Sequence, residues 1–322
     1  MASGSTVTLS GGTTMTQVVT GDTIDDADFN NARANVNRLL GNSQDVTLGT
    51  FTASSTYGWG QGGAGVNTVS AGTPVYASGS SVGFKDLQDD VQAMCAFLGV
   101  SLRSGVGSDV STSTTIAAST WSNLMLNIKD CWDNRFSPAS LPSATDASKT
   151  YTSAWTNSLT QETSWTFSNE NDCRRFFNGG GRLGFSASYS GSSGAQYNSW
   201  VNALSNMGNF WLMHNTSASG AGSISGVGFY ELSTGWQNLM TGSVGTTPYS
   251  GDTIVIQGRV NSTTNPTVVY LKIILTDASD NVIDQSSTGT LTINANRATP
   301  AANGSGFSFS SPSDGMSNIT GS

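Results

Sequence analysis

The stretch Val268-Val269-Tyr270-Leu271-Lys272-Ile273-Ile274-Leu275 is the longest apolar run in the chain. It is much shorter than the roughly 18 apolar residues that a membrane-spanning helix needs, and it contains a lysine. The run therefore predicts a buried strand, and it makes the C-terminal part of the chain a candidate β domain.

Strand-like segments lie on both sides of this run. Trp165-Thr166-Phe167-Ser168 alternates between apolar and polar residues, and 182–189 does so in part. One helix intervenes, because the apolar residues of 197–204 form a single stripe. Asp280-Asn281 is a candidate hairpin turn. Further strands are predicted at 210–213, 223–232, 235–240, 253–260, 267–276 and 288–294, which indicates an antiparallel sandwich with one helix.

Three amphipathic helices are predicted before that region. The first opens in the acidic segment Asp22–Asp28 and runs to Leu40, where Gly41 supplies a stop signal. The second begins near Phe84 and ends at Gly99. Each helix carries an aromatic residue, an apolar residue three positions on and a β-branched residue seven positions on: Phe29/Ala32/Val36, Phe84/Leu87/Val91 and Trp121/Leu124/Ile128.

The shared stripe indicates a degenerate internal repeat that packs into one small bundle. The alternative is that any three amphipathic helices show this spacing. Under either interpretation the stripes are core residues and not a binding site. The predicted fold class is α+β, with a helix-containing domain at 1–137, a linker at 138–164, a β-sandwich-like domain at 165–297 and a Gly/Ser-rich tail at 298–322.

Composition limits the classes of function. Charged residues make up 11% of the 322 residues, and the formal net charge is −8. Only 13 Lys and Arg are present, which argues against a nucleic-acid scaffold because phosphate neutralisation needs clustered cations. The N-terminus lacks the basic and apolar regions of a signal peptide. We expect a soluble chain that is made in a cytoplasm and does not insert into a membrane.

The cysteines and the single histidine offer little chemistry. Cys95, Cys131 and Cys173 form no CxxC motif, and His214 alone cannot build a multi-histidine metal site. Cys173 precedes Arg174-Arg175, and nearby cations lower a thiol pKa. A Cys173–His214 pair is therefore conceivable, although a packed structural cysteine is the preferred interpretation.

Carboxylates are the other candidates for catalysis. Glycoside hydrolysis needs two of them across a cleft, and the available residues are Glu162, Glu170, Asp172 and Glu231. Glu170 and Asp172 are expected on the same side of a strand. No spacing identifies a catalytic pair, so solvated strand-end positions are favoured.

Two loops resemble ligand sites only superficially. Asn178-Gly179-Gly180-Gly181 lacks the context of a phosphate-binding motif and predicts a tight turn into the next strand. Asp277–Asn281 lacks the glycine and glutamate of a calcium loop. No catalytic residue, cofactor or metal is therefore predicted, and the chain is not expected to be an enzyme.

Loop aromatics are the remaining candidates for a functional contact. Tyr57, Trp59 and Tyr249 lie in Gly/Ser/Thr-rich segments, as does Tyr151. Such rings can stack on sugars or on a partner chain, and the first three are the predicted ligand or partner contacts. The alternative is that they fill the core.

A family resemblance rests on several ordered motifs. The segment Cys173–Ser188, which contains Arg-Phe-Phe-Asn-Gly-Gly-Gly, is similar to a stretch in virion structural proteins of tailed phages, notably cyanophages and other marine phages. There a Trp-containing helix follows, as in Tyr197–Leu204. The N-terminal half resembles the same proteins in Asp28-Phe29-Asn30, in Tyr57-Gly58-Trp59-Gly60-Gln61 and in a second helix near Phe84. No motif of this kind is assigned in 240–322.

The resemblance implies a structural component of a virion, such as a tail or neck fibre or appendage, made in the host bacterial cytoplasm. It implies a homo-oligomer, with a trimer favoured over a hexamer, and contacts with other tail, neck or baseplate proteins. The alternatives are a receptor-binding module that contacts a host surface glycan, a capsid decoration protein and a virion-associated depolymerase.

Overall fold

The computed structural model describes residues 5–9, 14–39, 84–108, 110, 116–134, 138, 140–220, 222–245, 249, 251–278, 288–300 and 311–321. The chain divides into two compact units, which are described separately. The first contains Met1–Leu141 together with Asn178–Gly180 and Pro300–Phe309. The second contains Pro142–Phe177, Gly181–Thr299 and Ser310–Ser322.

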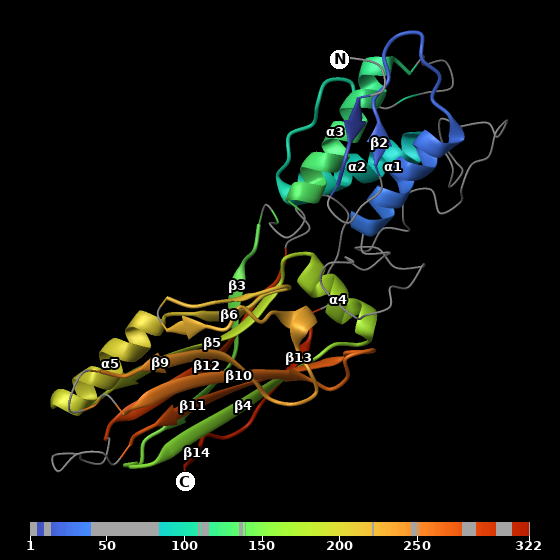
Figure 1. Ribbon diagram of the computed structural model, residues 1–322. Coiled ribbons are helices and arrows are strands. Elements are labelled where there is room, and N and C mark those ends of the chain that lie inside the picture. Colours follow the sequence, from blue (N-terminus) through green and yellow to red (C-terminus); the bar gives the residue numbers. More distant parts are fainter. Residues whose placement is uncertain are drawn as a thin grey trace. The chain divides into compact units, whose positions relative to one another are not determined.

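Three helices and a two-stranded ladder build the first unit (Figure 1). The predicted helices are confirmed at nearly the predicted positions. Leu40 and Gly41, the predicted end of the first helix, lie outside the described residues. The elements are β1 (Thr6–Val7), β2 (Met15–Thr16), α1 (Asp26–Leu39), α2 (Phe84–Leu98) and α3 (Ala118–Asp133).

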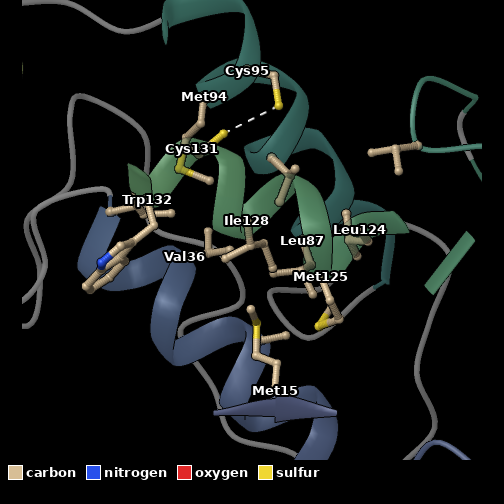
Figure 2. Packing of buried hydrophobic residues seen from close by; sticks show 14 of the residues in the cluster. Met15, Val36, Leu87, Met94, Cys95, Leu124, Met125, Ile128, Cys131 and Trp132 are labelled. Carbon is tan, nitrogen blue, oxygen red and sulfur yellow. Dashed lines mark hydrogen bonds between the residues drawn. The ribbon is translucent and has the colours of Figure 1, made fainter. Parts of the chain in front are cut away.

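The predicted stripes form the core of this unit. All nine stripe residues named above are buried. Figure 2 shows Val36 of α1, Leu87 of α2 and Ile128 of α3 meeting in one interior, so the prediction of a single small bundle is confirmed. Burial of each such side chain contributes about 1.5–3 kcal/mol.

Local signals begin and end these helices. The carboxylate of Asp25 accepts the backbone N–H of Asp28 at 2.8 Å, and the Asp28 carboxylate accepts the N–H of Asp25 at 3.4 Å. This reciprocal pair is a capping box in which aspartate replaces glutamate. Gly99 has φ of 68°, and the N–H of Val100 donates to the carbonyl of Cys95, as in a glycine-terminated helix.

The second unit is a sandwich of two antiparallel sheets with two helices, so the α+β class is confirmed (Figure 1). One sheet has the order β3-β12-β5-β6-β7, and the other has the order β13-β4-β11-β10-β9-β8, with β14 also paired to β4. The elements are β3 (Ser143–Tyr151), β4 (Ser158–Thr166), α4 (Glu170–Asn178), β5 (Arg182–Ser190), α5 (Ala195–Met207), β6 (Phe210–Leu212), β7 (Ser217–Ala218), β8 (Ser223–Ile224), the 3₁₀ turn η1 (Phe229–Glu231), β9 (Gln237–Ser243), β10 (Thr253–Val260), β11 (Val268–Thr276), β12 (Thr290–Ala298), β13 (Ser313–Met316) and β14 (Thr320–Gly321).

The apolar run at 268–275 forms most of β11, which lies between β4 and β10. Val269, Leu271, Ile273 and Leu275 are buried. The alternate side chains of the strand are only partly buried, so one face of the run, and not the whole of it, lies in the core. The prediction of a buried strand is therefore confirmed, with the burial confined to one face of the strand.

Several sequence predictions of irregular structure were wrong. Residues 138–164, predicted to be a linker, contain β3 and most of β4, and the tail at 298–322 contributes β13 and β14. In β4 the inward positions alternate correctly, but Gln161 and Thr163 occupy two of them and obscure the apolar pattern. No residue of β3 is buried, so this polar edge strand carried no hydrophobic signal at all.

Two further elements differ from expectation. Residues 170–178 form α4 where no helix was predicted. Of the strand predicted at 223–232, only 223–224 form a strand, β8, and 229–231 form the 3₁₀ turn η1. The glycine run after α4 is a tight turn into β5 as predicted: Gly180 has φ of 88°, and the N–H of Gly181 donates to the carbonyl of Phe176 at 2.8 Å.

Substitution of Gly184 in β5 tests how closely β5 and β6 approach each other. A Cβ atom at this position would overlap the backbone carbonyl oxygen of Phe210, so Gly184→Ala should lower the free energy of unfolding by about 1–3 kcal/mol. Gly235→Ala is the control, because the nearest atom to its added Cβ lies 3.9 Å away. Urea denaturation measures both, and equal midpoints for the two variants would contradict this packing.

Candidate functional site

The predicted aromatic contacts are only partly described by the structure. Tyr57 and Trp59 lie outside the described residues. Tyr249 is only 9% exposed, and its carbonyl accepts the backbone N–H of Asp252 in a turn. This burial favours the packing alternative for Tyr249. Its role as a ligand or partner contact stays a prediction.

Cys173 is fully buried in α4 and unsuited to be a nucleophile. Burial raises the pKa of its thiol well above the usual value, and the neighbouring Arg174 only partly opposes this effect. The thiolate that would act as a nucleophile is therefore strongly disfavoured. His214 lies just beyond the end of β6, where its carbonyl accepts the backbone N–H of Tyr230.

The acidic candidates mainly cap local structure. Glu170 and Asp172 lie in the first turn of α4 and not on a strand, which corrects the prediction. The backbone N–H of Asp172 donates to Asn169 Oδ1 at 3.0 Å, and Asn169 Nδ2 donates back to the Asp172 carboxylate. Glu231 Oε2 accepts the N–H of Gly228 at 2.7 Å and caps η1. These contacts give Asp172 and Glu231 a structural role.

The segment that superficially resembles a calcium loop is described only in part, because residues 279–281 lie outside the described residues. Asp277 is buried, and its Oδ1 accepts a hydrogen bond from Gln196 Nε2 of α5 at 2.7 Å. Within the described residues there is no group of three side chains suited to hold a metal ion.

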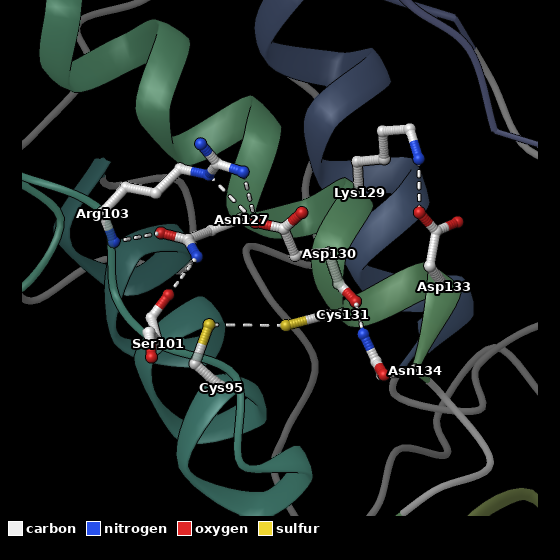
Figure 3. Close-up of polar contacts among 9 residues, drawn as sticks. All are labelled: Cys95, Ser101, Arg103, Asn127, Lys129, Asp130, Cys131, Asp133 and Asn134. Atoms are coloured by element: carbon white, nitrogen blue, oxygen red, sulfur yellow. Dashed lines mark hydrogen bonds and ion pairs between the residues drawn. The ribbon is translucent and has the colours of Figure 1, made fainter.

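Polar groups in the first unit fix the connection after α2 (Figure 3). Asn127 of α3 is buried; it accepts the backbone N–H of Arg103 at 2.9 Å and donates to the carbonyl of Ser101 at 3.0 Å. Nearby, the Cys95 and Cys131 sulfur atoms lie 3.4 Å apart as free thiols. The pKa of the Cys131 thiol is raised first by its hydrogen bond with Cys95 and second by its burial. These groups stabilise the bundle.

A cluster of cations and aromatic rings stands out on the outer face of the second unit. It consists of Trp236, Arg259, Tyr270 and Lys272, and we call it the cation–aromatic patch. Arg259 of β10 lies directly opposite Tyr270 of β11 in the sheet register. Trp236 immediately precedes β9, the next strand beyond β10. None of the four side chains belongs to the buried core.

The patch is organised by cation–π contacts. The guanidinium carbon of Arg259 lies 4.0 Å from the ring centroid of Tyr270 and 5.0 Å from that of Trp236. Lys272 Nζ lies 4.2 Å from the Trp236 centroid. The indole therefore contacts cations on both β10 and β11. Such contacts contribute about 0.5–1 kcal/mol each at exposed sites.

Neither cation of the patch forms an ion pair with a described acidic side chain. Among the described residues, no ion pair or hydrogen bond joins Arg259 or Lys272 to another side chain. Arg259 Nε is inaccessible to solvent and has no hydrogen-bond partner among the described residues. Glu162 is the cross-strand neighbour of Lys272 on β4, yet Lys272 lies against Trp236. The patch thus presents positive charge on a chain whose net charge is −8.

No local sequence pattern brings the four residues of the cation–aromatic patch together. Tyr270 and Lys272 lie two apart in the apolar run, so a strand prediction places them on one face. Trp236 and Arg259 join them only through the registers of β9, β10 and β11, which no local pattern specifies.

Neither a protein-family model, nor a curated protein, nor a solved structure matches this chain. In the described part of the chain, no helix combines the length and apolar character needed to cross a membrane.

Thiol labelling tests the assignment of the cysteines. Cys95, Cys131 and Cys173 are at most 1% exposed, so a colourless disulfide reagent that releases a chromophore should leave all three unmodified in the folded chain at pH 8. All three should react after denaturation in guanidinium chloride. Thr263→Cys, at an exposed loop position, is the control for reagent activity. Rapid stoichiometric labelling of a native cysteine would contradict the assignment.

Proposed function

We propose that this chain is a structural component of a tailed-phage virion, a tail or neck appendage protein that assembles as a homo-oligomer. A trimer is the favoured assembly, and a hexamer is the alternative. The proposal is supported chiefly by the location of the residues that carry the family resemblance. Most of these residues, where the structure describes them, pack inside one of the two units. They form no cluster of reactive side chains.

The resembling segment Cys173–Ser188 forms α4, the glycine turn and most of β5. Phe176, Phe177 and Phe185 from this segment are completely buried. The Phe177 ring stacks on Phe229 with centroids 4.1 Å apart and an interplanar angle of 8°. The resemblance therefore concerns how the sandwich is packed, which is the property that a structural protein requires.

The N-terminal motifs support the same conclusion. Asp28-Phe29-Asn30 lies in the first turn of α1, and the motif near Phe84 opens α2. Phe29, Phe84 and Leu87 are all buried in the bundle. In both units, then, the resemblance falls on positions that determine the scaffold.

β3 provides a surface for assembly. In the described part of the chain it pairs only with β12, so one edge of this nine-residue strand is unpaired. Its charged residues are Asp146 and Lys149, and Asp146 is bound to Arg297 at 3.1 Å. Edge strands with few free charges pair readily with strands of other chains. Copies of this chain can associate along β3, and closed symmetry is the usual outcome for homo-oligomers.

Light scattering after size exclusion tests the assembly. The wild-type chain should have a mass near three or six times 33.3 kDa. Thr150→Lys places a charge on the exposed edge of β3 and should shift the mass toward that of the monomer. Thr263→Lys adds the same charge at an exposed loop position and should leave the mass unchanged.

The outcomes separate the parts of the proposal. A monomeric wild-type chain would contradict the homo-oligomer. An oligomer that is unaffected by Thr150→Lys would retain the oligomer and exclude β3 as its surface. Immunogold labelling of the particles then tests the location, because labelled tails or necks fit an appendage, whereas labelled heads would favour a capsid decoration protein.

The cation–aromatic patch favours a second candidate function, a receptor-binding module that contacts a host surface glycan. Aromatic rings with nearby polar side chains are a common setting for sugar recognition, because the rings contact the apolar faces of sugars and the polar groups bind hydroxyls. Both functions are compatible in one chain, since assembly uses β3 and binding would use the outer face of β10 and β11.

A further inference from the structure

We infer that the cation–aromatic patch binds an acidic polysaccharide, whose carboxylates pair with Arg259 and Lys272. This inference rests on the glycan-binding role proposed above and specifies the chemistry of the ligand. It is independent of the assembly along β3. Three features of the described residues support it: the unpaired cations, the rings that hold them and the amide groups beside them.

The two cations are available for an anion. The four terminal N–H donors of Arg259 form a planar fork that matches a carboxylate, and none of them is used by a described residue, whereas its Nε is inaccessible. Lys272 has an acidic neighbour in register, Glu162, yet its ammonium group contacts the Trp236 ring. Both cations can therefore form an ion pair with an external anion.

The rings hold these cations in place before a ligand binds. Arg259 lies against Tyr270 at 4.0 Å, and both cations lie within 5.0 Å of the Trp236 ring centroid. Long side chains lose conformational entropy when they bind a ligand, and prior ordering lowers that cost. The two positive charges are thus fixed close together on adjacent strands.

Amide groups lie next to the cations on the same face. Gln257 of β10 is the register partner of Lys272, and its Nε2 donates to Asn238 Oδ1 of β9 at 2.7 Å. Both amides are at least partly exposed and retain donor and acceptor capacity. Sugar hydroxyls need such groups, so the patch combines contacts for a sugar ring, for hydroxyls and for a carboxylate.

The charge balance argues for an acidic glycan over a nucleic acid. The whole chain carries 13 Lys and Arg against 21 Asp and Glu, and two unpaired cations cannot neutralise a run of phosphates. A uronic acid instead presents a single planar carboxylate on a sugar ring, and one such group needs only local complementarity from a guanidinium or an ammonium group. Repetition of the patch in an oligomer would then strengthen a weak single contact.

Binding of polygalacturonate by the full chain tests this inference, with dextran as the neutral polymer. The wild-type chain should bind polygalacturonate and not dextran, and binding should weaken as salt increases. Lys272→Gln and Arg259→Gln should each weaken binding by about tenfold, because each removes a charge-assisted contact. Trp236→Leu should weaken it as well, because Lys272 then loses its ring contact and Arg259 keeps only the contact with Tyr270.

Lys129→Gln is the matched control, since it removes the same charge from an exposed helix position in the first unit and should leave binding unchanged. Thermal unfolding and light scattering of each variant show that the fold and the assembly are retained. Trp236→Phe keeps an aromatic ring and should bind more strongly than Trp236→Leu.

The possible binding results test the location of the site, its preference for an acidic polymer and its preference for a glycan separately. Equal losses for Lys272→Gln and Lys129→Gln would overturn the assignment to the patch. Equal binding of dextran and polygalacturonate would overturn the acidic specificity while retaining a glycan site. Stronger binding of single-stranded DNA than of polygalacturonate would show a nucleic-acid site instead. Absence of binding to any polymer would also remove the receptor-binding function, whereas the mass and virion labelling decide the structural role separately.

Discussion

The alternation of β11 is the constraint on which the second unit depends. Its inward side chains, Val269 to Leu275, are completely buried, and its register with β4 and β10 runs along the length of the strand. This one face supplies apolar area that must be covered by a second layer of the sandwich. The outward face is thereby directed toward solvent, where Tyr270 and Lys272 take part in the cation–aromatic patch. The core and the candidate binding surface are two sides of the same strand.

Polar contacts between strands of the two sheets add to the apolar packing of the sandwich. Trp165 of β4 is buried, and its indole N–H donates to the Asp146 carboxylate of β3 at 2.9 Å, which joins strands of the two sheets. Arg297 of β12 pairs with the same carboxylate and also donates to the carbonyl of Pro312. Partial burial raises the pKa of Asp146, while Trp165 and Arg297 oppose this effect. A carboxylate in this position is tolerated because both of its neighbours donate to it.

The proposed functions depend on different parts of the molecule. The family resemblance points to residues that pack the bundle and the sandwich, and it supports a structural role. The proposed self-assembly uses the edge of β3 that no described strand covers, whereas the proposed glycan contact uses the outer face of β10 and β11. A low proportion of charged residues, 11%, leaves most of the chain without strong electrostatic preferences. Against that background, two cations that lie on aromatic rings and pair with no described acidic residue form a distinct candidate site.

The sequence by itself determined the elements whose apolar periodicity is strong: the three stripes of the bundle, the helix at 197–204 and the strands at 253–260 and 267–276. Local signals sufficed there because each element buries one apolar face. Tertiary structure decided the rest. β3 is exposed, and Gln161 and Thr163 satisfy each other inside the core, so neither strand had an apolar signature. The cation–aromatic patch depends on strand register, which is set by pairing between distant residues and not by any local pattern.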